Sequence, residues 1–228
     1  MFRADVRFQL RHGFYLAYLL VTAAYVVVLR IVPTATRSAL TVALVFSDAS
    51  VLGFFFVGGS VLLERDQRVL ESLFVTPLHI TEYVLAKIAS LALLSLAVSV
   101  AIVLIGYGVP RHPLIFVLGT LLGSVVAVLI GLLISTRARH LNGYFGLSFV
   151  YVPFFVLPVL HVSGLWTTPI VYLMPPYAAL VLIAHGFFGG QWWQVLYGVL
   201  VQAVGIVVLF RMTNVWFRRY VVTRVGDA

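Results

Sequence analysis

The sequence contains no cysteine and very little charge. Without cysteine, a disulfide framework, thiol chemistry and a cysteine-based metal site are excluded. Only 10% of the 228 residues are charged, whereas soluble domains carry about 25%. Hydrophobic residues make up 62%, and the mean hydropathy is +1.10. One soluble core cannot bury so much apolar surface. The composition therefore indicates a membrane protein and excludes a soluble enzyme, a nucleic-acid-binding protein and a disordered chain.

Lysine is nearly absent as well, since Lys87 is the only one in the chain. It stands in the context Ala86-Lys87-Ile88. A Walker A loop needs Gly-x4-Gly-Lys-Ser/Thr, because backbone amides and the lysine together hold the phosphates. That motif does not occur here, so any ATP hydrolysis must take place on another polypeptide.

The histidines do not form a metal-binding pattern, and we expect no metal. No two of them are four residues apart, the spacing that places two imidazoles on one helical face as zinc ligands. An intramembrane serine protease would require Gly-x-Ser-Gly, and the nearest match, His161-Val162-Ser163-Gly164, lacks the first glycine. We therefore expect no catalytic residues and interfacial positions for the histidines, which are His12, His79, His112, His140, His161 and His185.

Six apolar stretches are long enough to cross a bilayer, which takes about 20 residues at a rise of 1.5 Å each. They predict an all-α membrane protein, with one transmembrane domain over residues 1–228 and a kink at Pro153 and Pro158 in the fifth span. The predicted spans are 13–32, 38–63, 83–105, 114–134, 143–160 and 192–212.

The basic residues fix the expected orientation. With six spans, twelve of the fifteen basic residues fall on the side of both termini, and only Arg30, Arg37 and Arg111 fall on the other. Basic residues concentrate on the cytoplasmic side, so both termini are expected there, in a multi-pass protein of the cell membrane. A seventh apolar stretch, 168–188, would invert this asymmetry if it crossed. We interpret it, within an external region 161–190, as a re-entrant helical hairpin.

The first twelve residues have an amphipathic helical pattern. Phe2, Val6 and Leu10 form one row at a spacing of four, and arginines form the adjacent row. Such a segment is typical of a helix lying in the membrane interface. A disordered basic tail is the alternative.

The cytoplasmic link 64–77, between spans two and three, also has a helical pattern. Its apolar residues 69, 70, 73 and 74 share one face, and Glu64 can pair with Arg68 on another. Thr76 and Pro77 fit the N-cap and first position of the following helix. The pattern predicts a short surface helix, which either contacts a partner protein or lies among the lipid headgroups.

Several motifs around this link resemble those of the ABC-2 type permeases, the membrane subunits of type V ABC exporters. The matching residues run from Gly53-Phe54-Phe55-Phe56-Val57-Gly58-Gly59 through Glu64-Arg65 and Thr76-Pro77-Leu78 to Tyr83-x3-Lys87. Within that family, the chain is most similar to the permease subunits of the mycobacterial fluoroquinolone-export system. This closer resemblance rests on 53–59, on Ser163-Gly164-Leu165-Trp166 with Pro169 and Tyr172-Leu173, and on Arg219-Tyr220-Val221-Val222.

The resemblance implies a permease subunit of an ATP-driven exporter of drugs or other amphipathic small molecules. Family members that export lipids, polysaccharides or peptides leave other substrates open. Two copies of a separate ATPase would bind ATP and Mg²⁺, a second permease, identical or related, would complete the path, and this chain would bind no cofactor. The residues that would contact the ATPase are Glu64, Arg65, Arg68, Leu70, Glu71, Leu73, Phe74, Thr76 and Pro77.

Two features of the first two spans are candidates for the substrate path. Tyr15, Tyr18, Thr22 and Tyr25 form one stripe along the first span. Tyrosine can stack on flat rings and also donate a hydrogen bond. The stripe either lines the path or a permease–permease seam, or packs within the chain.

The second feature is Asp48, which lies deep in the second span beside Ser47 and Ser50. A lipid-facing carboxylate at this depth costs roughly 2.5–3.5 kcal/mol, so it should face protein or a cavity. Asp48 either attracts cationic substrates, or it bonds a hydroxyl or amide in the bundle or pairs with Arg30.

The fourth span has small residues in one row, Gly119, Gly123, Ala127 and Gly131. Such a row allows close helix–helix approach, and we expect packing within the subunit rather than a functional site. A secondary transporter is a competing function for the whole chain. It should show inverted repeats and paired ionisable residues inside the spans. The sequence shows no repeat, and only Asp48 clearly lies inside a span.

Overall fold

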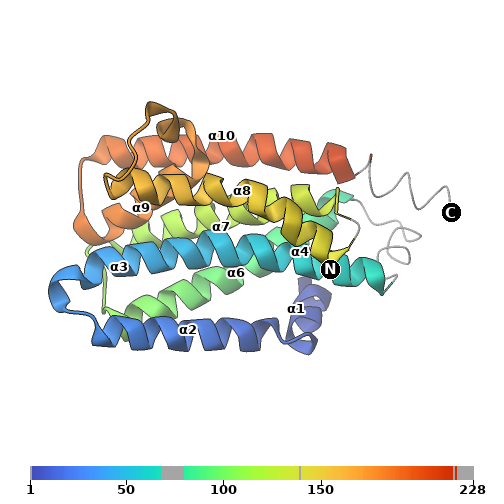
Figure 1. Ribbon diagram of the computed structural model, residues 1–228, viewed down its shortest axis with the longest axis horizontal. Helices are drawn as coiled ribbons and strands as arrows, with labels where there is room; N and C mark the ends of the chain where they lie inside the picture. Colours follow the sequence, from blue (N-terminus) through green and yellow to red (C-terminus); the bar gives the residue numbers. More distant parts are fainter. Residues whose placement is uncertain (1, 68–79, 139, 218, 220–228) are drawn as a thin grey trace.

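The computed structural model describes residues 2–67, 80–138, 140–217 and 219. Within them the chain is helical, and long helices run roughly parallel to form one bundle (Figure 1). Six segments are long and apolar enough to cross a membrane, which confirms the predicted number of spans. They are α2 (Phe14–Ile31), the continuous segment Thr34–Asp66, α6 (Ile80–Gly106), α7 (Pro113–Ser135), α8 (Leu141–Val162) and α10 (Trp192–Phe217).

The second span is interrupted at its centre. It consists of α3 (Thr34–Ser47), a π-helical turn η1 (Asp48–Leu52) and α4 (Gly53–Asp66). A π turn inside an α-helix often marks a functional position. Here it begins at Asp48, the acidic residue that the sequence singled out. The structure also extends α4 to Asp66, so Glu64 and Arg65 belong to the end of this span, whereas the sequence placed them in a separate surface helix.

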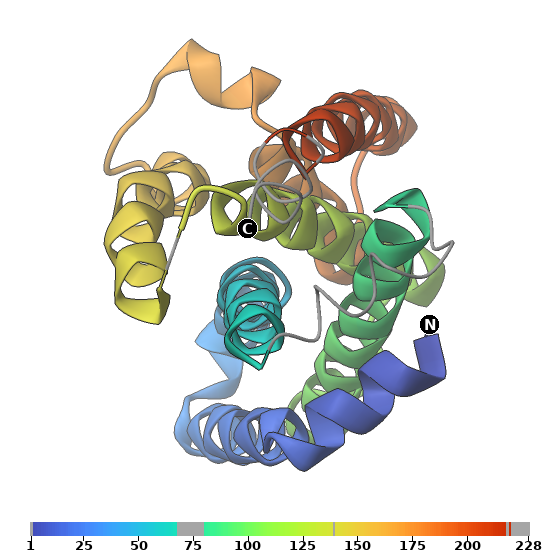
Figure 2. The same ribbon diagram turned by 90° about the vertical axis from the view of Figure 1, so that its right-hand side faces the viewer.

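The core lies between α4, α6, α7 and α9 (Pro175–Phe188). Figure 2, along the long axis, shows α7 among α4, α6 and α10, with α2 and α8 at the periphery. Glycines allow this packing. A Cβ on Gly119 would come within 2.6 Å of Leu182, and one on Gly123 within 2.9 Å of Ala179. The small-residue row of α7 thus packs within the subunit, as predicted.

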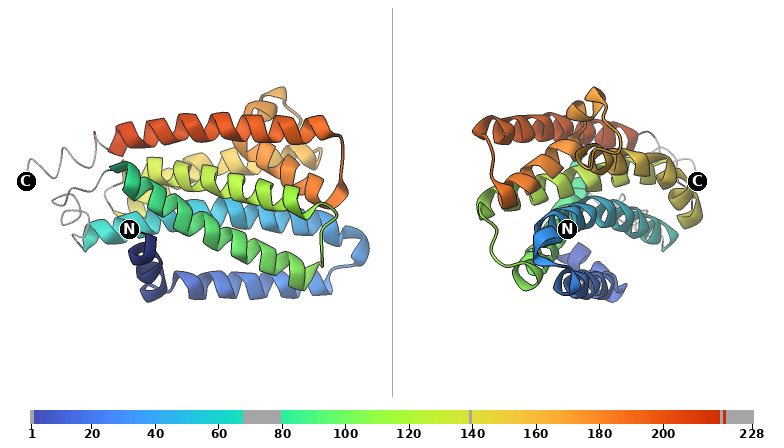
Figure 3. Two further views of the ribbon diagram at one scale, coloured as in Figure 1. Left: turned by 180° about the vertical axis from the view of Figure 1, so that it is seen from behind. Right: turned by 60° about the vertical axis from the view of Figure 1, so that its left-hand side comes forward.

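The segment 168–188 contains the 3-10 turn η2 (Pro169–Leu173) and α9. At 14 residues, α9 is about 21 Å long, which is too short to cross a bilayer. It packs against α7 and α10, and the view from behind shows it inside the bundle (Figure 3). Protein covers this helix, which is the condition for a re-entrant segment.

The first residues form α1 (Phe2–Arg11), which turns at Gly13 into α2. Gly13 has a φ of +76°, a conformation that favours glycine. Leu10 and Arg11 point outward, in agreement with the amphipathic pattern. A third face of α1, with Asp5 and Gln9, is buried against α6, and the sequence pattern had not indicated it.

Candidate functional site

Lys87 lies in a buried ionic cluster at the end of the bundle where α1, the end of α4 and the start of α6 meet. Its side chain forms ion pairs with Asp5 of α1 and with Glu64 of α4, and the distance from Nζ to Glu64 Oε1 is 2.5 Å. Lys87 is 1% exposed, Asp5 6% and Glu64 5%. Two carboxylates therefore neutralise the only lysine away from water. We call Asp5, Glu64, Lys87 and their hydrogen-bonding neighbours the lysine cluster.

Neutral polar groups complete the lysine cluster. Lys87 also donates to Ser60 Oγ at 2.7 Å, and the phenol of Tyr83 donates to Glu64 Oε2 at 2.7 Å. On the α1 side, Gln9 Nε2 donates to Ser90 Oγ at 2.9 Å, and Ser90 donates to Asp5. Removing one partner from a buried ion pair typically costs about 3–5 kcal/mol, because the other charge is left uncompensated. The cluster therefore fixes α1, α4 and α6 relative to one another.

Members of the lysine cluster lie at the start of the predicted cytoplasmic link 64–77 and shortly after its end. Glu64 lies in the last turn of α4, and Tyr83 and Lys87 are the fourth and eighth residues of α6. Arg65 Nη1 donates to the backbone carbonyl of Ala138 at 2.6 Å, which ties the same end to the segment after α7. Arg68, Leu70, Glu71, Leu73, Phe74, Thr76 and Pro77 lie outside the described residues.

Asp48 lies in a second buried polar group, in the middle of the bundle. Its side chain is 0% exposed, and Oδ2 accepts hydrogen bonds from Ser99 Oγ at 2.9 Å and Ser95 Oγ at 3.4 Å. Ser124 of α7 donates to Ser95 at 3.1 Å. Of the structural alternatives that the sequence left open for Asp48, the bond to a hydroxyl is the one found, and Arg30 instead donates to the carbonyl of Ile105. Three helical segments thus share this niche.

Three oxygens of this region have no hydrogen-bond partner among the described residues. They are Oδ1 of Asp48, the phenol of Tyr18 and the hydroxyl of Thr120, and all three residues are at most 1% exposed. Buried polar groups are normally paired. The niche is therefore a polar region inside the bundle with unused hydrogen-bonding capacity among the described residues.

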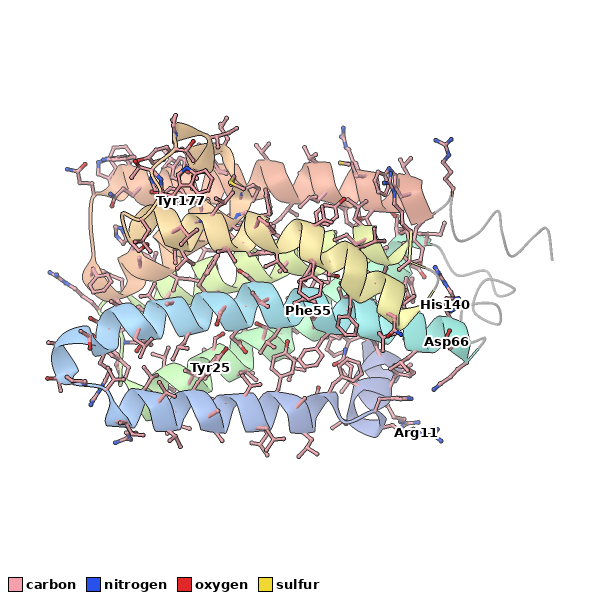
Figure 4. All side chains as sticks on the ribbon, viewed as in Figure 1. Arg11, Tyr25, Phe55, Asp66, His140 and Tyr177 are labelled. Atoms are coloured by element: carbon pink, nitrogen blue, oxygen red, sulfur yellow. The ribbon has the colours of Figure 1, made fainter. Side chains whose placement is uncertain are left out.

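The tyrosine stripe of α2 faces its own chain at two of its positions. Tyr18 is 1% exposed and packs against the ring of Phe56, and the phenol of Tyr25 is 3.2 Å from Ser47 Oγ. Figure 4 shows Tyr25 directed from α2 towards α3. Thr22 bonds back to the carbonyl of Tyr18, and Tyr15 is half-buried. Tyr18 and Tyr25 are therefore packing residues, and a role of the stripe in the substrate path stays a prediction.

Gly58, within the motif 53–59, is explained by Tyr144 of α8, a residue that the sequence did not single out. Its phenol donates to the carbonyl of Phe54 at 2.6 Å, and its ring lies over Gly58, where a Cβ would come within 1.9 Å. Gly131 of α7 borders the same ring, since its Cβ would be 3.2 Å from the phenol oxygen. Two glycines on different helices thus leave room for one aromatic side chain. The pairing spans 90 residues and leaves no local sequence signal.

Comparison with known proteins agrees with this architecture. Residues 1–225 match the fluoroquinolones export permease protein family. Two relatives from strains of Mycobacterium tuberculosis, each described as a fluoroquinolones export permease protein, are 32% identical over 227 residues, which cover 98% of this chain and 96% of each relative. The chain belongs to this family. It is a membrane permease, a transport protein rather than an enzyme.

Family membership argues against the protease interpretation of residues 161–164. His161 lies in the last turn of α8 and packs edge-on against the rings of Tyr172 and Tyr177, so aromatic contacts explain its position. Among the described residues, no three His, Cys, Asp or Glu side chains form a group that could hold a metal ion.

The permease also has an apolar cavity of about 540 Å³ between α7, α8 and α10. Its walls include Ile130, Tyr151, Phe154 and Val204. This volume lies in the range of small-molecule sites, about 300–1,000 Å³. The cavity is separate from Asp48 and from the tyrosine stripe, and no sequence pattern pointed to it.

Proposed function

We propose that this permease is the membrane subunit of an ATP-driven exporter of the ABC-2 type, and that a separate polypeptide hydrolyses ATP. The permease family supports the exporter, and the burial of Lys87 carries the assignment of ATP hydrolysis to another polypeptide. The only lysine of the chain is 1% exposed and paired with two carboxylates, so it cannot reach a nucleotide phosphate. An energy source based on ATP must therefore lie on a partner.

The lysine cluster gives such a partner a mechanical connection. The link that the proposal assigns to the ATPase leaves α4 after Glu64 and returns into α6 before Lys87. A force on the link reaches two ion-paired helices and, through Asp5, also α1. Farther along the second span is the π turn at Asp48, a local irregularity that can absorb a change in helix direction.

The proposed working unit has two permeases and two ATPase subunits, with both termini of each permease in the cytoplasm. Its substrates are drugs or related amphipathic small molecules, because the two mycobacterial relatives are described as fluoroquinolone exporters. The 540 Å³ cavity is large enough for such a molecule. The path itself would run between the two permeases.

Co-purification tests the proposal. The permease is co-expressed with an ATP-binding protein encoded beside it, and each complex is isolated through a tag on the permease. Replacing Leu73 and Phe74 with serine should release the ATPase and leave insertion unchanged. Replacing Leu165 and Trp166 with serine removes two exposed apolar side chains at the opposite end and should leave the complex intact. Normal ATPase recovery and transport with both variants would refute the coupling role.

A further inference from the structure

The end of the bundle opposite α1, here called the far end, carries no negative charge. It consists of 32–37, 107–112, 162–174 and 188–191. The sequence has no aspartate or glutamate between Tyr83 and Gly226, and none from 6 to 47. The basic groups within these segments or next to them are Arg30, Arg37 and Arg111, together with His112, His161 and His185.

Two of these arginines are bonded to the backbone, and the third is not. Arg30 donates to the carbonyl of Ile105 at 2.6 Å, and Arg37 donates to that of Val32 at 3.2 Å. Arg111 is exposed and has no hydrogen bond or ion pair within the described part of the chain. Arg111 is thus a cation whose hydrogen-bonding capacity is unused.

Two glycines bring Arg111 together with two histidines. Nη1 of Arg111 and Nε2 of His112 lie 3.6 Å and 3.4 Å from the place where a Cβ on Gly189 would stand. Gly189 has a φ of +72°, so the left-handed backbone itself favours glycine. The rings of His112 and His185 are 5.8 Å apart. The side chains of Arg111, His112 and His185 therefore lie close together beside the turn between α9 and α10.

His185 supplies a buried nitrogen that lacks a partner. The residue is 7% exposed, and its Nδ1 has no hydrogen-bond partner among the described residues. A Cβ on Gly190 would stand 3.0 Å from this nitrogen. The amide oxygen Oε1 of Gln194 lies 2.3 Å from the same Cβ position, so glycine leaves room there for both side chains. Buried polar groups are normally paired, and a ligand in the adjoining pocket can supply the missing partner of Nδ1.

The two histidines line one end of a pocket of about 520 Å³. Trp192 forms one wall, and Ile115, Val195 and Val199 line the deeper part. The pocket thus has a polar end beside Arg111 and an apolar body, with a volume in the range of small-molecule sites. This polarity matches an amphipathic molecule whose charged group is at one end.

We propose that this pocket binds small organic anions, specifically carboxylates attached to an aromatic or other apolar body. A carboxylate accepts charge-assisted bonds from the arginine fork and the imidazoles, while the apolar body contacts Trp192 and the aliphatic wall. A metal cation fits poorly, because Arg111 repels it and the far end offers no carboxylate ligand. That this pocket releases exported substrates is an inference that rests on the proposed function. The binding of carboxylates to the pocket does not depend on it.

Direct binding to the purified full-length protein tests the proposal. The protein is placed in nanodiscs of phosphatidylcholine without ATP or partner, and binding of 1-naphthoate is measured by calorimetry. Neutral 1-naphthalenemethanol serves as the matched uncharged probe. We expect Arg111→Gln and His112→Gln each to weaken naphthoate binding at least tenfold. Arg37→Gln, at the same end and away from the pocket, should leave it unchanged, and thermal unfolding confirms that each variant is folded.

Three results would overturn the proposal. The first is equal affinity for the charged and the neutral probe. The second is an equal loss with Arg37→Gln and Arg111→Gln, since this would reflect only the general positive charge of the far end. The third is loss of naphthoate binding when anionic phosphatidylglycerol replaces zwitterionic phosphatidylcholine, which would make an anionic lipid headgroup the occupant. Because no ATPase is present, failure of the ATP-driven mechanism cannot produce any of these results.

Discussion

The ring of Tyr144 occupies the space that a side chain at Gly58 would need. A Cβ on Gly58 would lie 1.9 Å from the Tyr144 ring, and the phenol is bonded to the carbonyl of Phe54 at 2.6 Å. This contact attaches the peripheral helix α8 to the second span at Phe54 and Gly58, two and six residues after the π turn. Tyr144 is fully buried, although most of α8 has few contacts with the bundle.

Gly58→Ala should destabilise the permease by about 1–3 kcal/mol, the usual cost of overpacking a well-packed site. Gly59→Ala is the matched control, because nothing lies within 4 Å of its Cβ position. Because alanine favours a helix interior over glycine, this substitution should raise the free energy of unfolding by up to about 1 kcal/mol. Thermal unfolding of the two variants in detergent measures the difference. Equal midpoints would show that Tyr144 moves away without cost.

Lys87→Met should destabilise the protein by about 3–5 kcal/mol, because the buried carboxylates of Asp5 and Glu64 lose their counter-charge. Glu82→Gln, an exposed change in the first turn of α6, should stay within about 0.5 kcal/mol of the parent. Adding Asp5→Asn and Glu64→Gln to Lys87→Met removes all three charges and should restore part of the lost stability. A parent-like midpoint for Lys87→Met alone would contradict the account of the cluster.

Asp48→Asn should fold and assemble normally, because the amide oxygen can still accept the hydrogen bond from Ser99. If the charge of Asp48 acts on substrates, the variant hydrolyses ATP at the normal rate but exports cationic or zwitterionic compounds less well than neutral ones. Transport of a matched charged and neutral pair in membrane vesicles measures this. Equal export of both classes would leave Asp48 with the structural role that its bonds to Ser95 and Ser99 indicate.

Asp227→Cys introduces the only cysteine of the chain and reports the orientation of the C-terminal region. With twelve of the fifteen basic residues on the side of the termini, a membrane-impermeant thiol reagent should label it only after permeabilisation. Leu165→Cys, exposed between α8 and η2, should be labelled in intact cells. Labelling of Asp227→Cys in intact cells would reverse the topology.

Hydropathy and charge were sufficient to predict the spans. Each span is defined by consecutive apolar residues, and the basic residues between spans are equally local features. The structure agrees within four residues at every boundary except the end of the sixth span, where α10 extends to Phe217. The small-residue row of α7 was also predictable, because a spacing of four places its members on one helical face.

The sequence by itself determined that this chain is an all-helical membrane protein with six spans and without a Walker A motif. Only the tertiary structure decided that Lys87 pairs with Asp5 and Glu64, which precede it by 82 and 23 residues, and that Asp48 bonds Ser99 and not Arg30. Hydropathy and helical period describe neighbours along one helix. Which buried polar groups meet depends on how separate helices rotate and pack, and no local pattern encodes that choice.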